Sequence, residues 1–498
     1  MAELTREEVE ARIAEYVEAR KQAEEEELEE EREELEEEIR EEEEGEEPDE
    51  EPVTDLVVEE EEEVPGPLEN LDLSGLDLSD MPFMGISLNG SNLSSSNLSG
   101  SNLSGVSLEE ADLQNADLSN ANLSDANLSG SNFTHAILED ANLQKTLAIG
   151  ADFSQANLER ADIRNAKFIE TNFSKAIFQE ANLGGADFTR SKLCDAKVMN
   201  ADLNRARFNG ADLTNADFTD SRLSMAGFFE ANFTGANLNR VLLKGSKLCN
   251  ANLTDTRLCR ADMTGADLSD SKLHRADLTR AKLNGAILRR TDLEGSFLDE
   301  ANLNIADLTG ANLVNVKLSG AELGRIKLVE AKLRGAHLAG ANLSKAKLGN
   351  VELSGADISG GNLTGADFNH ANLENSDLSR ADLQDAILES ANLKNSFFMG
   401  VDLREANLEG ANLEGCNLAG SKLNRAKLIR AILTGGDLQR CNLEHADLSH
   451  ADLTGANLAG SKLADARFKN ANLTGANLTG ADIADTDFSG AKGYSAPK

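Results

Sequence analysis

The residues that could do chemistry in this chain are six histidines, five cysteines and many Asp and Asn side chains. Only His445 and His450 are close in sequence, which is too few ligands for a zinc site. The cysteines form no CxxC pairs. The chain also lacks a P-loop, an HExxH sequence and a G-x-G-x-x-G sequence in a βαβ setting. We therefore expect no enzyme, and predict no catalytic residues, no metal and no cofactor.

A five-residue repeat occupies most of the chain. Every fifth residue from Leu73 to Phe488 is a sizeable apolar residue, with the single exception of Ala148, so that 84 pentapeptides follow one another in register. Most of these central residues are Leu, and the residue two positions before each of them is usually Ala. Self-similarity at a fixed period predicts a repeat architecture and not a set of ordinary globular domains.

The five-residue period fits neither a helix nor a flat strand. On a helix, steps of five residues scatter the leucines around the axis, and on a flat strand they place successive leucines on opposite faces. Within one repeat, however, the small residue and the Leu are two apart and point to one side of a short extended piece. A turn after each piece coils the chain around its own leucines, and each coil gains its core from its neighbours. So narrow an interior explains why the chain has no Trp and only two Tyr.

The repeat resembles a known family. Runs such as ADLSNANLSDANLSG at 116–130 and ANLTGANLTGADI at 471–483 follow the pattern A(D/N)LXX of the pentapeptide-repeat family. The resemblance implies an all-β solenoid over residues 71–490, a right-handed quadrilateral β-helix with four pentapeptides per coil. The 84 pentapeptides would form about 21 coils, and at ~4.8 Å per coil the solenoid would be roughly 100 Å long. Residues 491–498 form a short C-terminal tail.

Residues 1–44 are predicted to form an acidic helical arm in front of the solenoid. Thr5 and Glu8 have the spacing of a capping box, which marks the start of a helix. The apolar stripe of this helix is thin and its second half is very rich in Glu, so we expect a solvated helix. The candidate contacts of the arm are the glutamates Glu24, Glu27, Glu31, Glu38 and Glu42.

Residues 45–70 are acidic and contain four of the six prolines, a composition that predicts a disordered linker. The arm and the linker together hold 34 acidic and 6 basic residues, which is −28 of the total charge of −40. The solenoid is therefore closer to neutral. Residues 71–180 hold 15 acids and 5 bases, residues 181–350 hold 19 and 24, and residues 351–498 hold 20 and 13.

Outward apolar residues are the candidate partner contacts. Three Phe leave the central register, and two of them are five coils apart, each ten positions after an Ile. Exposed apolar side chains that cluster mark partner sites. The candidates are Phe229, Ile287, Phe297, Ile387 and Phe397.

These features favour a non-enzymatic protein-interaction scaffold or adaptor that presents a rigid solenoid and an acidic arm to protein partners. The arm could bind a basic partner or fold onto the basic middle of its own solenoid, residues 181–350, and the sequence leaves both open. It also leaves open whether the ends of the solenoid stack into a homodimer. We expect no direct binding of nucleic acid.

The family resemblance adds two alternatives. Some members mimic duplex DNA and thereby protect gyrase, but duplex DNA carries one charge per ~1.7 Å, and a solenoid with a net charge of −12 is too weakly charged to mimic it along its whole length. Only residues 71–180 could mimic DNA locally. Other pentapeptide-repeat proteins are associated with bacterial contractile secretion systems, which implies an accessory adaptor or effector role.

The sequence predicts neither a membrane span nor a signal peptide. The N-terminal MAELTREEVE lacks a basic region and an apolar stretch, and no run approaches the ~20 apolar residues of a membrane helix. Together with the few cysteines, this predicts a cytoplasmic location. Secretion without a cleaved signal stays open.

Overall fold

The computed structural model describes residues 4–44 and 68–494, so most of the predicted linker lies outside the described residues. The chain divides into two compact units, Met1–Asn172 and Phe173–Lys498, and each is described by itself. Within the described ranges, no helix is long and apolar enough to cross a membrane.

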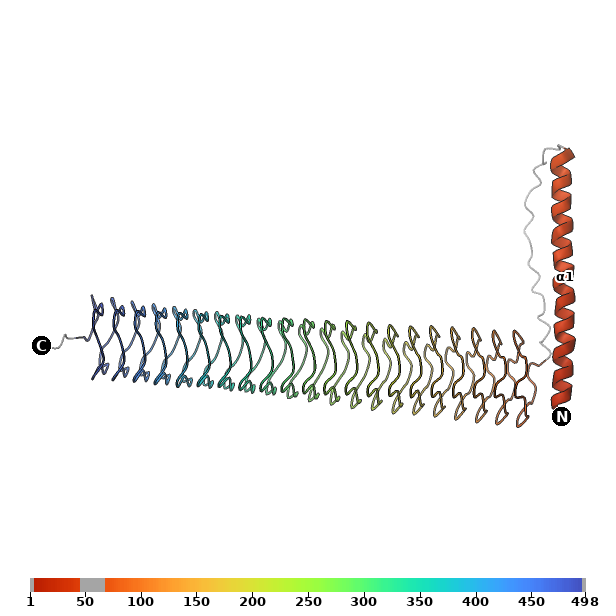
Figure 1. Cartoon of the computed structure of the whole chain (residues 1–498), viewed down its shortest axis with the longest axis horizontal. Helices are drawn as coiled ribbons and strands as arrows, with labels where there is room; N and C mark the ends of the chain where they lie inside the picture. Colours follow the sequence, from red (N-terminus) through yellow and green to blue (C-terminus); the bar gives the residue numbers. More distant parts are fainter. Residues whose placement is uncertain (1–3, 45–67, 495–498) are drawn as a thin grey trace. The chain divides into compact units, whose positions relative to one another are not determined.

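The helix α1 spans Arg6–Glu44, as the sequence predicts (Figure 1). It starts with the expected capping box: the Thr5 N–H donates to Glu8 Oε2 at 2.7 Å, and the Glu8 N–H donates to Thr5 Oγ1 at 3.3 Å. These bonds satisfy backbone N–H groups that have no partner inside the helix. Ion pairs four residues apart follow along the exposed surface of α1, namely Arg6–Glu10, Arg20–Glu24 and Arg32–Glu36.

The first turns of α1 pack against coils of the same unit, which corrects the prediction of a solvated helix. Val9 is fully buried and Ile13 is 5% exposed. The Arg6 guanidinium donates to the carbonyls of Asp77 at 3.4 Å and Ser79 at 3.0 Å. Further along α1, the apolar side chains of Val17, Leu28 and Leu35 are exposed, so the burial described here concerns the first turns of the helix.

In both units the repeat forms a β-helix in which four pentapeptides make one coil (Figure 1). Its strands are single-residue parallel bridges between equivalent positions of neighbouring coils, from Asp72↔Asn92 in the first unit to Asn472↔Lys492 in the second. The central N–H bonds to the neighbouring coil, as the Leu253 N–H does to the Lys272 carbonyl at 2.6 Å. Hydrogen bonds therefore run between coils, as in the β-helix that the resemblance implies.

The interior of a coil is filled by the central residue and by the small residue two positions before it, and nearly all of these side chains are buried. Where Ser replaces the inward Ala, its hydroxyl donates to a backbone carbonyl. Ser96 Oγ bonds to the Leu93 carbonyl at 2.7 Å, and Ser101 Oγ bonds to the Leu78 carbonyl at 2.8 Å. These bonds remove the penalty for burying a hydroxyl, so Ser fits a site that is otherwise apolar.

Two cysteines occupy the same inward position. Cys416 and Cys441 are buried, and their Sγ atoms lie 2.8 Å and 2.9 Å from the carbonyls of Leu393 and Leu418. Burial raises the pKa of both thiols to about 12. Since the thiolate is the reactive form, both act as small apolar fillers and not as redox groups.

Phe side chains at equivalent central positions of neighbouring coils stack on one another. In the first unit, the Phe133 and Phe153 ring centroids are 4.5 Å apart and the rings are parallel within 2°. In the second unit, Phe188, Phe208 and Phe228 form a ladder with centroid distances of 4.9 and 5.3 Å. Such stacked aromatic pairs add to the stabilisation from burial.

The last residue of each pentapeptide turns the corner of the coil in the left-handed conformation. Gly235, for example, has φ +71°, and an added Cβ would lie 2.6 Å from Asn215 Oδ1. Gly, Asn and Asp tolerate this conformation best. Among the left-handed corners of the described residues, the only β-branched side chain belongs to Ile305.

Replacing both Val9 and Ile13 by Ala should loosen the first coil of the first unit. The change removes about five buried methylene-sized groups, or about 4 kcal/mol of packing at ~0.8 kcal/mol each. Amide hydrogen exchange at Leu73 and Leu78 should accelerate. The matched control is Val17→Ala, which alters an exposed side chain and should leave exchange unchanged. Equal protection in the double variant and the wild type would contradict this role of α1.

Candidate protein-contact surface

Outward residues at equivalent positions of successive coils stack into columns, each joined by consecutive bridges. One column of the second unit contains two of the candidate contacts, Phe297 and Phe397. The part of this column around them consists of Asp277, Phe297, Lys317, His337, Asp357, Asp377, Phe397 and Asn417. Five bridges separate the two Phe, or roughly 24 Å at ~4.8 Å per bridge. They share one side of the coils, but charged and polar residues lie between them.

Ile287 and Ile387 belong to another column of the second unit and are also five bridges apart. This column precedes the Phe297 column by two pentapeptides, which is half a coil. The two columns therefore lie on opposite sides of the coils. The four candidates form two separated pairs and not a single patch.

The immediate surroundings of the outward Phe differ. Phe297 is 37% exposed, and Lys317 Nζ lies 5.0 Å from its ring centroid, within cation–π range. Phe229 is exposed and has no exposed apolar neighbour in its pentapeptide. Phe397 has one, Met399, and the two are 52% and 54% exposed. Sequence reasoning missed Met399 because it occupies a position that the repeat leaves variable.

The candidate glutamates of the arm lie on α1. Glu24, Glu27 and Glu31 are exposed. The carboxylate of Glu24 accepts a hydrogen bond from Arg20 at 3.0 Å. The side chains of Glu38 and Glu42 lie outside the described residues.

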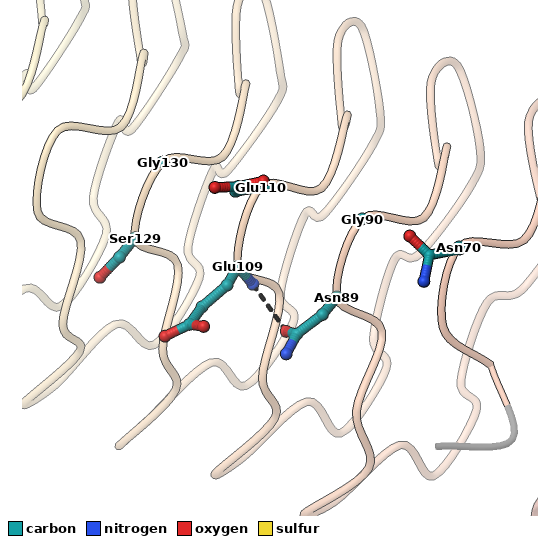
Figure 2. Close-up of a pocket in the computed structure, with 7 residues that line it drawn as sticks. All are labelled: Asn70, Asn89, Gly90, Glu109, Glu110, Ser129 and Gly130. Atoms are coloured by element: carbon teal, nitrogen blue, oxygen red, sulfur yellow. Dashed lines mark hydrogen bonds between the residues drawn. The ribbon is translucent and has the colours of Figure 1, made fainter. Parts of the chain in front are cut away.

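A pocket in the first unit is lined by polar side chains from successive coils (Figure 2). Glu109 and Glu110 bring two carboxylates to it. The neighbouring Asn89 is already engaged, because its Oδ1 accepts hydrogen bonds from Ser107 Oγ at 2.7 Å and from the Glu109 N–H at 2.9 Å. The lining contains no Lys, His or Cys that could serve these carboxylates as an acid or a nucleophile.

One group of the described residues has the composition of a metal site, namely His274, Asp292 and Glu294, with ligand atoms within 4.8 Å of one another. Its members already bond to neighbouring side chains. His274 Nε2 lies 2.6 Å from Asp292 Oδ2, and the Asn312 amide donates to Asp292 at 2.9 Å and to Glu294 at 3.3 Å. Sequence reasoning missed the group because only the spacing between histidines was considered, although His274 and Glu294 are one coil apart in the sequence.

Arginines at the corners of the second unit pair with acids one coil earlier. Three of these pairs have nitrogen–oxygen distances of 2.6 to 2.7 Å, namely Arg240–Asp220, Arg275–Asp255 and Arg290–Asp270. Charge is also balanced by count, because residues 181–316 hold 17 acids and 17 bases. Residues 317–350 hold 2 acids and 7 bases. The excess positive charge of residues 181–350 is therefore confined to residues 317–350.

The family model for Pentapeptide repeats (8 copies) matches the chain in successive stretches between residues 86 and 490. The chain belongs to the pentapeptide-repeat family. This confirms the resemblance carried by the A(D/N)LXX pattern. No curated protein matches this pentapeptide-repeat chain.

Solved structures of other repeat proteins are similar to it. HetL, involved in heterocyst differentiation regulation in the cyanobacterium Nostoc sp. Strain PCC 7120, is 33% identical, over 49% of this chain and 89% of HetL, with a TM-score of 0.20. A pentapeptide repeat protein of the Arabidopsis thaliana thylakoid lumen is 35% identical, over 20% of this chain and 69% of its own, with a TM-score of 0.20. Full-length QnrB1, a plasmid-mediated fluoroquinolone resistance protein, is 22% identical, over 36% of this chain and 90% of QnrB1, with a TM-score of 0.17.

Asp307 is a nearly buried carboxylate of the pentapeptide-repeat surface, with an exposed fraction of 8%. It accepts hydrogen bonds from Thr309 Oγ1 at 2.6 Å and Arg289 at 2.8 Å, and Lys327 Nζ lies 3.5 Å away. Burial acts to raise the pKa of Asp307, but the hydrogen bonds from Thr309 and Arg289 outweigh it and lower the pKa to about 2.

The stability of the second unit should therefore depend on the ionisation of Asp307. Because the folded-state pKa lies below the unfolded value, the carboxylate stabilises the protein at neutral pH, and this contribution is lost as the pH falls from about 4 through about 2. Asp307→Asn should lower the free energy of unfolding by about 2 kcal/mol at pH 7, and by clearly less near pH 2.5, as measured by guanidinium unfolding. Asp385→Asn, at an exposed corner, is the matched control. An equal loss at both pH values would contradict the assignment.

Proposed function

We propose that this pentapeptide-repeat protein is a non-enzymatic interaction scaffold or adaptor for protein partners. Its β-helix would be right-handed and quadrilateral, with about 21 coils for the 84 pentapeptides. The coils would present one set of contacts and the Glu-rich part of α1 a second. We place this role in the cytoplasm, from the composition and the N-terminal sequence.

The observation that carries the proposal is the exposure of large apolar side chains on an otherwise polar surface. Phe397 and Met399 project from one pentapeptide and are each more than half exposed. Their exposure does nothing for the fold, because the corresponding positions of other pentapeptides hold polar residues without any change in the coil. Exposed apolar groups that gather at one place are typical of contact sites, so this pair supports partner binding.

The polar side chains of the surface support binding and not catalysis. Outward Asp and Asn side chains accept a hydrogen bond from the N–H two residues later, as Asp187 does from Thr189 at 3.0 Å and Asp267 from Ser269 at 3.0 Å. Such local bonds stabilise turns. These carboxylates are therefore engaged in shaping the coil.

A second candidate function, local mimicry of duplex DNA, is favoured by the charge of residues 71–180. Their net charge is −10. At ~4.8 Å per coil of four pentapeptides, this stretch is roughly 26 Å long, and duplex DNA of that length carries about 15 charges. About two thirds of that charge is present, which would suit a DNA-binding partner such as gyrase.

Point variants of the full chain test these functions better than deletion of the arm, because deletion would also remove the buried Val9 and Ile13. The double variant Phe397→Ser, Met399→Ser should lose a captured partner at both low and high salt, because the contact is apolar. The matched control is Ile432→Ser, which alters a 42% exposed side chain on a different column. Affinity capture followed by mass spectrometry provides the readout.

Replacing Glu24, Glu27 and Glu31 together by Gln should remove partners that are captured only at low salt, because exposed charge contacts are screened. Identical partner sets for the wild type and both variants would contradict the scaffold function. Inhibition of gyrase supercoiling that survives in both variants would favour DNA mimicry instead. Steady turnover of a substrate would overturn both functions.

A further inference from the structure

Four of the seven basic residues of residues 317–350 lie at one corner of two adjacent coils in the second unit. Arg325 and Lys345 are consecutive left-handed corner residues, with φ +57° at each. Lys327 and Lys347 lie two residues further on in their coils and are joined by a bridge. All four side chains are exposed. They form a two-by-two array of basic residues, and the backbones of the two coils that carry them are ~4.8 Å apart.

Unlike Arg240, Arg275 and Arg290, the corner residues Arg325 and Lys345 have no acid at the corner one coil earlier. The column of Lys327 and Lys347 is flanked by Asp307 and Asp367. Of the four bases in the array, only Lys327 has a carboxylate within ion-pair distance among the described residues. That carboxylate belongs to Asp307, which also pairs with Arg289. The similarly placed Arg425 and Lys427 occur in one coil only, and Arg425 lies 3.6 Å from Glu405. Like charges this close repel one another, so the array does not stabilise the fold by itself.

A strained residue adjoins the array. Ile305 occupies the corner immediately before Arg325 in the same column and has φ +58°. Its side chain is 59% exposed. A β-branched side chain in the left-handed conformation is disfavoured, and exposure offers no packing to offset the strain. Backbone outliers of this kind concentrate at contact sites.

We call the set formed by Ile305, Arg325, Lys327, Lys345 and Lys347 the basic corner. Its chemistry fits a partner segment that carries carboxylates beside an exposed apolar side chain. The second half of α1 is such a segment. Its side chains Leu28 and Leu35 are 66% and 60% exposed.

The spacing on α1 matches the spacing of the basic corner. Around the two leucines lie the exposed carboxylates of Glu27, Glu31 and Glu34. Residues three or four apart on a helix are separated by about 4.5 to 6 Å along its axis. That distance is close to the separation of neighbouring coils, so two carboxylates that are one helical turn apart can face the bases of the two adjacent coils.

We propose that the basic corner binds the Glu-rich half of α1 from a second copy of this chain. The carboxylates of Glu27, Glu31 and Glu34 face the four bases, and a leucine of α1 covers Ile305. A protein segment is favoured over nucleic acid, because the basic corner combines its four bases with the 59% exposed apolar side chain of Ile305, which a phosphate backbone would leave uncovered. This self-association goes beyond the proposed function and requires no other protein.

Sedimentation equilibrium of the purified full chain measures this association directly. At 50 mM salt the average mass should rise with concentration, and at 500 mM salt it should stay at the monomer value, because the contact is electrostatic. A mass that stays at the monomer value at all concentrations in low salt overturns the proposal. This outcome includes binding of α1 to the basic corner of its own chain, which would leave the mass monomeric. Since no partner protein is present, this result is separate from the outcome of affinity capture.

Charge reversal identifies the surfaces. Replacing the four bases by Glu, which already occupies corners such as Glu300 and Glu330, should raise the dissociation constant at least about tenfold. The matched control, Arg425→Glu with Lys427→Glu, should associate like the wild type. An equal loss in the control overturns the proposal. Circular dichroism verifies that each variant is folded.

The second variant reverses the charge of α1 through Glu27→Lys, Glu31→Lys and Glu34→Lys. It should not associate with itself, since its basic helix meets a basic corner. Mixed with the variant in which the four bases are replaced by Glu, it should associate again. The Lys-bearing α1 of the second variant then faces the Glu-bearing corner of the first. Failure of the mixture to associate overturns the proposal. Ile305→Gly should weaken wild-type association while raising the melting temperature, because it relieves strain and removes an apolar contact.

Discussion

The hydrogen bond between neighbouring coils is the interaction on which the rest of the structure depends. Each central N–H donates to a carbonyl of the next coil, as in Leu253 to Lys272. This bond fixes the coil at four pentapeptides and holds every inward position inward. A slip by one residue would turn the buried Ala and Leu to the solvent. Stacking and burial thus enforce the same register, and neither would hold without the other.

The features that follow from this periodic constraint could be predicted from the sequence. The register from Leu73 onward, the narrow interior and the stacking of Phe188, Phe208 and Phe228 all need only the period and the size of the side chains. The capping box at Thr5 could be predicted as well, because it depends only on two residues that are three apart in the sequence. The burial of Val9 is different, because it depends on a contact between a helix and a coil that no period specifies.

The candidate surface was harder to predict because residues that are neighbours on it belong to different coils. The net charge of residues 181–350 shows only a weak excess of bases. It does not show that this excess lies entirely within residues 317–350. Read with the period of the coil, the pairing of Arg240 with Asp220 and the absence of such a partner at Lys345 could both have been found. The period alone identifies Ile305 as the β-branched residue at a corner position. Its strain needed the backbone angles, because the positive φ of the corner is a property of the folded coil.

A solenoid of this kind separates the residues that carry the fold from those that can carry a function. Inward positions accept few types of side chain and are nearly uniform, whereas the left-handed corners hold Gly, Asn and Asp but also many Arg, Glu and Lys residues. The outward positions are restrained mainly by the chemistry of the turn, which Asp and Asn satisfy. The side chain of Phe397 contributes neither to the interior nor to the turn, and that of Arg325 is exposed at a corner that Gly, Asn or Asp would form with less strain. Because the fold does not depend on such side chains, they are the ones available for the contacts with other molecules that we propose.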